Sequence, residues 1–284
     1  MKFLLLLSAT LSLAAASFKV EVSGVKGKPP MILIPGLSSS GEVWKDTVAR
    51  YKDKYECHVL TLAGFAGVPL ENKEPGMLLR VRTELAAYIR DKKLEKPTIV
   101  GHSLGGFLAL WIASQETALI GDLVIVDSLP NLAAVFGPGF NAKAMRDMIA
   151  NQPREDYDKF VRSGAALRGM TGSPEHLETI KQWSIKSDQW AAANGMYELL
   201  TTDLQADIAK IRSRTLILGS WIGMKEFTTR EIVEGNFRKQ YAPLPGHQFA
   251  LADNARHFIM YDDPNWFFAQ LDSFLLAKKI SQSK

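Results

Sequence analysis

The chain has 284 residues, of which 46% are hydrophobic and 23% charged, and its net charge is +4 at pH 7. This composition excludes a disordered or fibrous chain and supplies enough apolar material for one large core. The Lys and Arg residues are dispersed and accompany no nucleic-acid-binding motif, so we expect no nucleic-acid partner. No internal repeat and no linker rich in Gly, Ser or Pro divides the chain, which favours one core domain.

The beginning of the chain has the pattern of an export signal. Lys2 gives a positive start, residues 3–13 form an apolar run too short for a comfortable membrane span, and Ala14 and Ala16 provide a cleavage site of small residues. We predict that residues 1–16 are a signal peptide and that the mature protein is secreted or periplasmic, with no stable membrane span. An uncleaved anchor or a buried N-terminal helix is the alternative.

Cys57 is the only cysteine, so the chain cannot form an intramolecular disulfide bond. Export would permit such bonds, but a domain of this size does not need one. Because Cys57 lies in an apolar run, we interpret it as a buried hydrophobic residue and not as a catalytic thiol.

Seven short, nearly wholly apolar runs predict strands that are buried on both faces. Segments with helical period lie between them, which predicts an α/β fold with a mostly parallel sheet flanked by helices. The predicted strands are Phe18–Val22, Met31–Ile34, His58–Leu62, Thr98–Val100, Leu123–Val126, Thr215–Leu218 and Gln248–Ala252. The helical segments include the stripes Trp44/Val48/Tyr51, Leu78/Val81/Leu85/Ile89 and Phe267/Leu271/Phe274/Leu275, and the almost wholly apolar Leu104–Ser114.

Residues 129–205 form too long a connection between two strands to be a simple loop. They contain amphipathic stretches at residues 142–150, 156–167 and 190–200. We therefore predict a helical cap at residues 129–205, inserted into a core that comprises residues 17–128 and 206–284. Apolar residues of this cap and of the loop after the strand at 215–218 suit an apolar ligand; they are Leu129, Leu132, Val135, Phe136, Phe140, Met145, Trp183, Trp190, Met196, Trp221 and Met224.

The segment from Gly101 to Gly105 reads G-x-S-x-G between a β-branched strand and an apolar helix. Such a turn presents its serine in a strained conformation, and glycine is needed on both sides because a side chain would collide with the neighbouring strand and helix. We predict Ser103 as a nucleophile. The helix that begins at Leu104 points its positive end at this site, where it favours a developing oxyanion.

Two further segments complete this chemistry. The strand at residues 31–34 ends in Pro-Gly, which predicts backbone N–H groups at the carboxyl edge of the sheet, so Leu37 and Leu104 are the expected oxyanion donors. Among the five histidines, His257 alone occupies a loop after the last predicted strand, where the chain order Ser, acid, His requires the general base. His102 lies inside the elbow, where its ring points away from the nucleophile and is expected to pack behind the site.

On these segments the chain resembles the α/β-hydrolase family, in its serine esterase and lipase-like branch, over nearly its whole length after residue 16. The resemblance rests on Gly-His-Ser-Leu-Gly-Gly, on Pro-Gly-Leu, and on His257-Phe258 with Asp263-Pro264 after it. It implies an eight-stranded core with a cap after the sixth strand, although only seven strands are apparent in the sequence.

The resemblance also implies a catalytic acid in a Gly-x-x-Asp turn after the strand at 215–218, but Ile222 occupies that position. Asp127, at the end of the strand at 123–126, is the favoured substitute because a strand end fixes a carboxylate more rigidly than a mobile loop does. Glu226 is the alternative acid. Asp127 has a purely structural alternative role, in which it braces the cap.

A serine nucleophile predicts acyl transfer through an acyl-enzyme, and neither a metal nor a cofactor is expected. The leading prediction is hydrolysis of carboxylic esters or lactones of small to medium apolar substrates. Hydrolysis of amides or of carbon–carbon bonds needs the same residues and is an alternative. A non-catalytic ligand-binding protein is the alternative from another class, and it would be favoured if neither Asp127 nor Glu226 approached His257.

Overall fold

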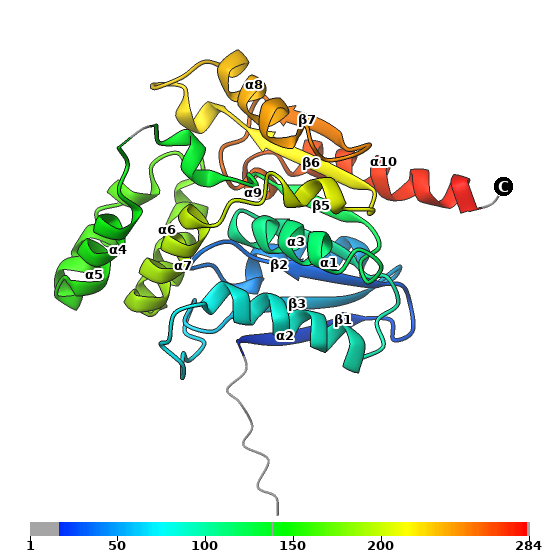
Figure 1. Ribbon diagram of the computed structural model, residues 1–284, viewed down its shortest axis with the longest axis horizontal. Helices are drawn as coiled ribbons and strands as arrows, with labels where there is room; N and C mark the ends of the chain where they lie inside the picture. The colour runs from blue at the N-terminus through cyan, green and yellow to red at the C-terminus, as the bar shows by residue number, and fades with distance from the viewer. Residues whose placement is uncertain (1–16, 138, 283–284) are drawn as a thin grey trace, which may run out of the picture.

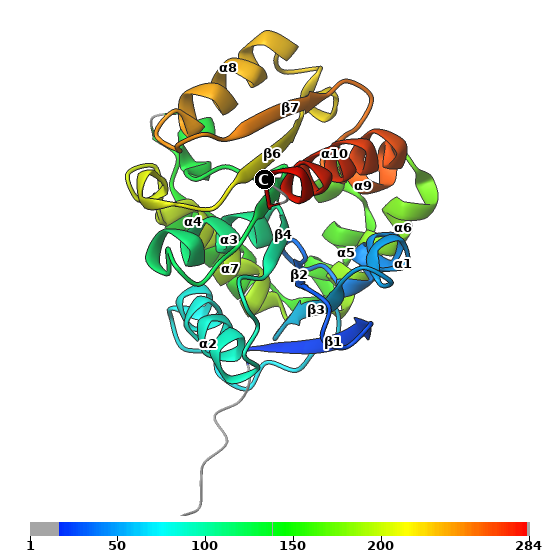
Figure 2. The same cartoon turned by 90° about the vertical axis from the view of Figure 1, so that its right-hand side faces the viewer.

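The computed structural model describes residues 17–137 and 139–282, so the predicted signal peptide at residues 1–16 lies outside the described residues. Seven strands form one sheet in the order β1-β3-β2-β4-β5-β6-β7. β1 pairs with β3 in antiparallel fashion, and all the other pairings are parallel. Figures 1 and 2 show this sheet through the middle of the molecule with helices on both faces.

All seven strands predicted from the sequence are present. They are β1 (Phe18–Gly24), β2 (Pro30–Ile34), β3 (Glu56–Leu62), β4 (Thr98–His102), β5 (Leu123–Val126), β6 (Thr215–Ser220) and β7 (Gln248–Ala252). The described residues contain no eighth strand, so the count implied by the family resemblance is wrong for this part of the chain. The carboxyl ends of β2, β4 and β5 lie side by side, because β4 pairs with both of the others.

Burial on both faces is wrong for β1. Phe18 is buried, but Val22 on the same strand is 55% exposed. The reason is its place in the sheet, since β1 is an edge strand with a single neighbour. In β2, by contrast, Ile32 and Ile34 enter one core cluster while Met31 and Leu33 enter the other, as the alternating direction of strand side chains requires.

The two core clusters lie on opposite faces of the sheet. One is covered by α2 (Met77–Asp91), α3 (Leu104–Gln115) and α8 (Arg230–Tyr241), and the other by α1 (Lys45–Tyr51), the short α9 (Ile259–Asp262) and α10 (Pro264–Gln282). Figure 2 shows α2 and α3 on one side of the strands and α1, α9 and α10 on the other. α3 begins directly after β4 and is buried along nearly its whole length.

Among the described residues, four α-helices lie between β5 and β6: α4 (Ala142–Asn151), α5 (Arg154–Arg162), α6 (Pro174–Lys186) and α7 (Gln189–Thr201). They group together beside the sheet, at the left of Figure 1. The predicted stretches at 142–150 and 190–200 match α4 and α7, whereas 156–167 is divided between α5 and a 3₁₀ turn at Ala165–Leu167. The family resemblance implies a cap after the sixth of eight strands. Among the described residues there are seven strands, and this insertion follows the fifth of them. Among the described residues, no helix is both long and apolar enough to cross a membrane.

Candidate active site

Ser103 occupies the sharp turn between β4 and α3. Its backbone has φ 52° and ψ −120°, a combination that residues with a side chain seldom adopt. The turn is held from two directions, since the N–H of Ser103 donates to the carbonyl of Val126 at 2.9 Å and its own carbonyl accepts from the N–H of Phe107 at 3.0 Å. These bonds fix the serine at the carboxyl edge of the sheet.

Gly101 and Gly105 make this turn sterically feasible. A Cβ atom on Gly101 would lie 2.2 Å from the carbonyl oxygen of Gly105, and one on Gly105 would lie 2.2 Å from the carbonyl oxygen of Ile34. Strand β2, strand β4 and the first turn of α3 therefore approach too closely for any side chain at these two positions, as the sequence pattern predicts.

Asp127 and His257 meet directly. Oδ2 of Asp127 lies 2.7 Å from Nδ1 of His257 and 2.9 Å from the hydroxyl of Ser220, while Oδ1 accepts the N–H of Ser220 at 2.7 Å. The side chains of Asp127 and His257 are only 12% and 25% exposed. A carboxylate at Nδ1 holds the ring in the tautomer whose Nε2 is free to accept a proton.

The backbone that carries Asp127 is fixed as firmly as its side chain. Asp127 has a φ of 46°, and its N–H donates to the carbonyl of Leu218 at 2.7 Å. The hydroxyl of the buried Tyr241 donates to the carbonyl of Ser128 at 2.7 Å, which holds the residue that follows. A strained backbone conformation of this kind persists only where the surroundings determine it from several sides.

Glu226 takes no part in this contact between Asp127 and His257. It lies in an exposed turn after the 3₁₀ helix Ile222–Met224, and in the part of the chain that the structure describes no hydrogen bond or ion pair joins it to His257. Of the two acids proposed from the sequence, Asp127 is the one that the fold brings to the imidazole.

The backbone N–H groups of Leu37 and Leu104 face no protein acceptor within residues 17–137 and 139–282. Leu104 is the first residue of α3, where the helix leaves its N–H groups unpaired and its positive end exposed. Leu37 follows Gly36, whose backbone lies so close to Ser103 that an added Cβ atom would be 3.2 Å from Cβ of Ser103. Both predicted oxyanion donors are therefore free and flank Ser103.

Comparison with known proteins identifies the family of this chain. Residues 31–270 match the model of the alpha/beta hydrolase family. The chain belongs to the alpha/beta hydrolase family. The matched span contains the elbow, the insertion and the loop of His257, so the family covers both the sheet and the candidate site.

The relatives of this hydrolase-family chain are distant. A pimeloyl-[acyl-carrier protein] methyl ester esterase of Aliivibrio salmonicida is 29% identical over 152 residues, which cover 54% of this chain and 56% of the esterase. The chain thus spans little more than half the length of that relative. An N-formylmaleamate deformylase of Pseudomonas putida is 24% identical over 257 residues, or 86% of this chain and 88% of the deformylase.

Among solved structures, the enol-lactonase of Burkholderia xenovorans superposes with a TM-score of 0.74 over 91% of this chain and 96% of the lactonase. Its sequence identity is 14%, so this likeness concerns the fold alone.

A cavity of about 1010 Å³ opens at the site, and Ser103, Asp127 and His257 all line it. Apolar residues of the insertion and of α8 form most of its wall. From the residues predicted as lining, the cavity includes Leu129, Leu132, Val135, Phe136, Met145, Met196 and Met224, but not Phe140, Trp183, Trp190 or Trp221. Further apolar residues line the cavity that were not predicted from the sequence, namely Ile149, Phe160, Val161, Leu167, Met170, Ile180, Leu199, Phe227, Ile232, Val233 and Phe237.

The insertion is tied to the loop that carries His257. The N–H of Phe258 donates to the carbonyl of Met170 at 2.9 Å. Asp262 accepts the hydroxyl of Thr171 at 2.6 Å and the N–H of Arg256 at 2.9 Å. The segment between α5 and α6 is therefore bonded to the loop that carries His257.

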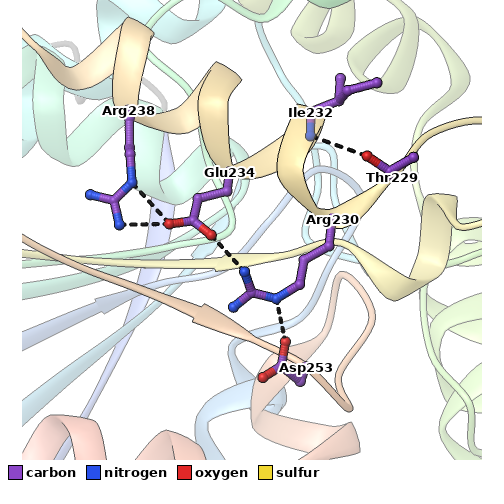
Figure 3. Close-up of polar contacts among 6 residues, drawn as sticks. All are labelled: Thr229, Arg230, Ile232, Glu234, Arg238 and Asp253. Atoms are coloured by element: carbon purple, nitrogen blue, oxygen red, sulfur yellow. Dashed lines mark hydrogen bonds and ion pairs between the residues drawn. The ribbon is translucent and has the colours of Figure 1, made fainter.

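Residues 221–229, the β6–α8 loop, also contribute to the cavity wall, and both ends of this loop are anchored. Ser220, just before it, bonds Asp127. At the other end, Arg230 donates to Asp253 at 2.7 Å and to Glu234 at 2.6 Å, and the hydroxyl of Thr229 accepts the N–H of Ile232 at 3.4 Å (Figure 3).

The remaining candidates from the sequence are structural. Cys57 is buried in β3, and burial raises the pKa of its thiol to about 11. His58 bonds the hydroxyl of Tyr88 at 2.8 Å, and His176 stacks on Tyr261 with ring centroids 4.0 Å apart. No cluster of three metal-binding side chains occurs among the residues that the structure describes.

Proposed function

We propose that this protein is a serine hydrolase that cleaves carboxylic ester or lactone bonds of small to medium apolar substrates. The observation that carries the proposal is the 2.7 Å contact between Asp127 and Nδ1 of His257, at the wall of the same cavity that Ser103 lines. It supplies an oriented base beside a strained serine, which a purely binding protein does not need.

In the proposed reaction, Oγ of Ser103 attacks the carbonyl carbon while Nε2 of His257 takes the hydroxyl proton. The carbonyl oxygen becomes an oxyanion that accepts the N–H groups of Leu37 and Leu104, each worth about 2.7–4 kcal/mol of the barrier. Collapse of the tetrahedral intermediate expels the alcohol, which receives the proton from His257. A water molecule then gives its proton to His257 and attacks the acyl-enzyme, which releases the acid and restores Ser103.

The cavity wall supports an apolar substrate. Its lining is dominated by aliphatic, aromatic and methionine side chains, and Ser103, Asp127 and His257 are among its polar groups. We propose that residues 129–205 act as a cap that holds the acyl or alcohol group against the core. Similar proteins include a methyl ester esterase and an enol-lactonase, which supports ester or lactone hydrolysis. Because another relative is an N-formylmaleamate deformylase, removal of an N-formyl group is a second candidate reaction.

A panel of substrates with a covalent probe tests the proposed function. Purified protein should hydrolyse apolar esters or lactones more rapidly than matched amides, and a serine-directed phosphonate should label Ser103 at one equivalent, as measured by peptide mass spectrometry. Ser184 lines the same cavity on α6 and serves as the control, because Ser184→Ala should leave the labelling unchanged. Labelling at any other residue, or none, would contradict the proposal.

We also propose export, with cleavage after Ala16. Glu84 supports this site, since its carboxylate accepts both the backbone N–H and the hydroxyl of Ser17 at 2.7 Å. After cleavage, Ser17 would carry a terminal ammonium group, for which a carboxylate is the better partner. N-terminal sequencing of the exported protein should begin at Ser17. Exported material that retains Met1 would show that residues 1–16 are not removed.

A further inference from the structure

His102 immediately precedes the nucleophile, and its ring is completely buried. Nε2 of this ring lies 3.0 Å from the backbone carbonyl oxygen of His257. Because a carbonyl oxygen only accepts, Nε2 carries the proton and donates. The nucleophile's direct neighbour in sequence is thus bonded to the main chain of the candidate base, although 155 residues separate the two histidines.

Close packing on the other sides of the His102 ring restricts its movement. Phe258 packs beside it with ring centroids 4.5 Å apart, and an added Cβ atom on Gly36 would lie 3.1 Å from Nδ1. Nδ1 has no hydrogen-bond partner among the described residues. Burial, with the nearby imidazole of His257, holds the pKa of His102 well below its usual range, so the ring stays neutral at neutral pH.

His257 is therefore held at three points, one of which is the bond from its own N–H to the carbonyl of Gly169 at 3.4 Å. Asp127 holds Nδ1 of the side chain, which determines the tautomer and the ring orientation. His102 holds the carbonyl oxygen, which determines where the backbone of the His257 loop sits relative to Ser103. The same ring also touches Gly36, on the loop that carries the oxyanion donor Leu37.

We propose that His102 is a positioning residue that sets the separation of Ser103 and His257 through its bond to the His257 carbonyl, a role that rests on the proposed hydrolase function. The ring takes no part in proton transfer. Its contribution is to keep the two reacting side chains at a fixed spacing while the insertion, which is bonded to the same loop, admits substrate.

Three substitutions separate positioning from packing. His102→Leu fills the space without a donor. His102→Gln carries an amide N–H at about the reach of Nε2, and its carbonyl replaces an acceptor that is already unpartnered. His102→Asn is equally polar but its amide reaches only as far as Nδ1. The three variants thus change the donor and its reach at a single buried position.

The expected result is a loss of kcat, counted per phosphonate-reactive site, of about 10²-fold in the Leu and Asn variants, because misplacement by about 1 Å has that effect. KM should change little, since the apolar residues of the insertion and of α8 that form most of the cavity wall are unchanged. The midpoint of the pH profile should stay in place because Asp127 still holds Nδ1. His102→Gln should recover most of the lost kcat. A purely structural role would instead lower thermal stability with kcat per site unchanged.

Hydrogen exchange of the peptide spanning residues 255–259 gives a second measurement that needs no substrate. Exchange should accelerate in the Leu and Asn variants and return towards the wild-type rate in the Gln variant. Equal exchange in all variants, or equal kcat per site, would overturn the positioning role. If the wild-type protein cleaved no ester at all, the proposed function would fail, but the exchange comparison would still decide whether His102 fixes the loop. If the Leu variant does not fold, the Gln and Asn variants alone decide.

Discussion

Replacing Ser103 with alanine is expected to lower kcat by about 10⁶-fold, the scale found when a hydrolase of this type loses its nucleophile. Only Oγ is removed, so no acyl-enzyme can form, although the free N–H groups of Leu37 and Leu104 remain. Alanine tolerates the φ of 52° no worse than serine does, so the melting temperature should stay within a few degrees of the wild type. Steady-state kinetics and a thermal melt measure both quantities.

Ser184→Ala is the matched control for this experiment, because it removes a hydroxyl from the same cavity at a position without a proposed role. It should retain wild-type kcat. A Ser103→Ala protein that kept more than a small fraction of the activity would place the nucleophile elsewhere in the chain.

Asp127→Asn should lower kcat by about 10⁴-fold, as expected when the acid that orients a catalytic histidine becomes an amide. The amide can present an N–H to Nδ1 of His257 where the carboxylate now accepts, and this favours the tautomer with the proton on Nε2. The low-field proton resonance of Nδ1–H should disappear together with the activity, and one-dimensional NMR of the wild type and the variant would record it.

Glu226→Gln is the control for this substitution, because the side chain is exposed and no hydrogen bond or ion pair joins it to His257 among the described residues. Its kcat should match the wild type. If Glu226→Gln were inactive and Asp127→Asn active, the acid would belong to the β6–α8 loop, and Asp127 would be a brace between β5 and β6.

Strands β2 to β6 were predictable because their apolar runs are mostly buried, and burial follows local composition. β7, at the other edge of the sheet, is buried only at Leu251 and Ala252. The helix α6 was not singled out, although Ser173 caps its N-terminus and Pro174 opens it, a combination that marks helix starts. α8 was missed in the same way despite its cap at Thr229. Because both helices are only partly apolar, their apolar stripes are weak signals in the sequence. Their capping residues are the clearer signal.

The site was predictable to the extent that its signals are local. The elbow around Ser103 is one short pattern, and Asp127 could be proposed because a strand end is visible in the sequence. The partners that hold these residues are not local: Ser220 is 93 residues from Asp127, and Tyr241 is 113 residues from Ser128. The bond from His102 to the His257 carbonyl is of the same kind. Such contacts depend on which strands become neighbours, and no single segment encodes that order.

Because the proposed acid, Asp127, directly follows β5, the β6–α8 loop supplies no residue to the proposed reaction. Its two ends are anchored at Ser220 and Arg230. Its side chains Met224 and Phe227 are 53% and 79% exposed and also line the cavity. Substitutions in this loop are therefore expected to alter the compounds that fit without disturbing the proposed proton transfer between Ser103 and His257. Natural or laboratory evolution can diversify substrate range on this segment independently of the bond-breaking machinery.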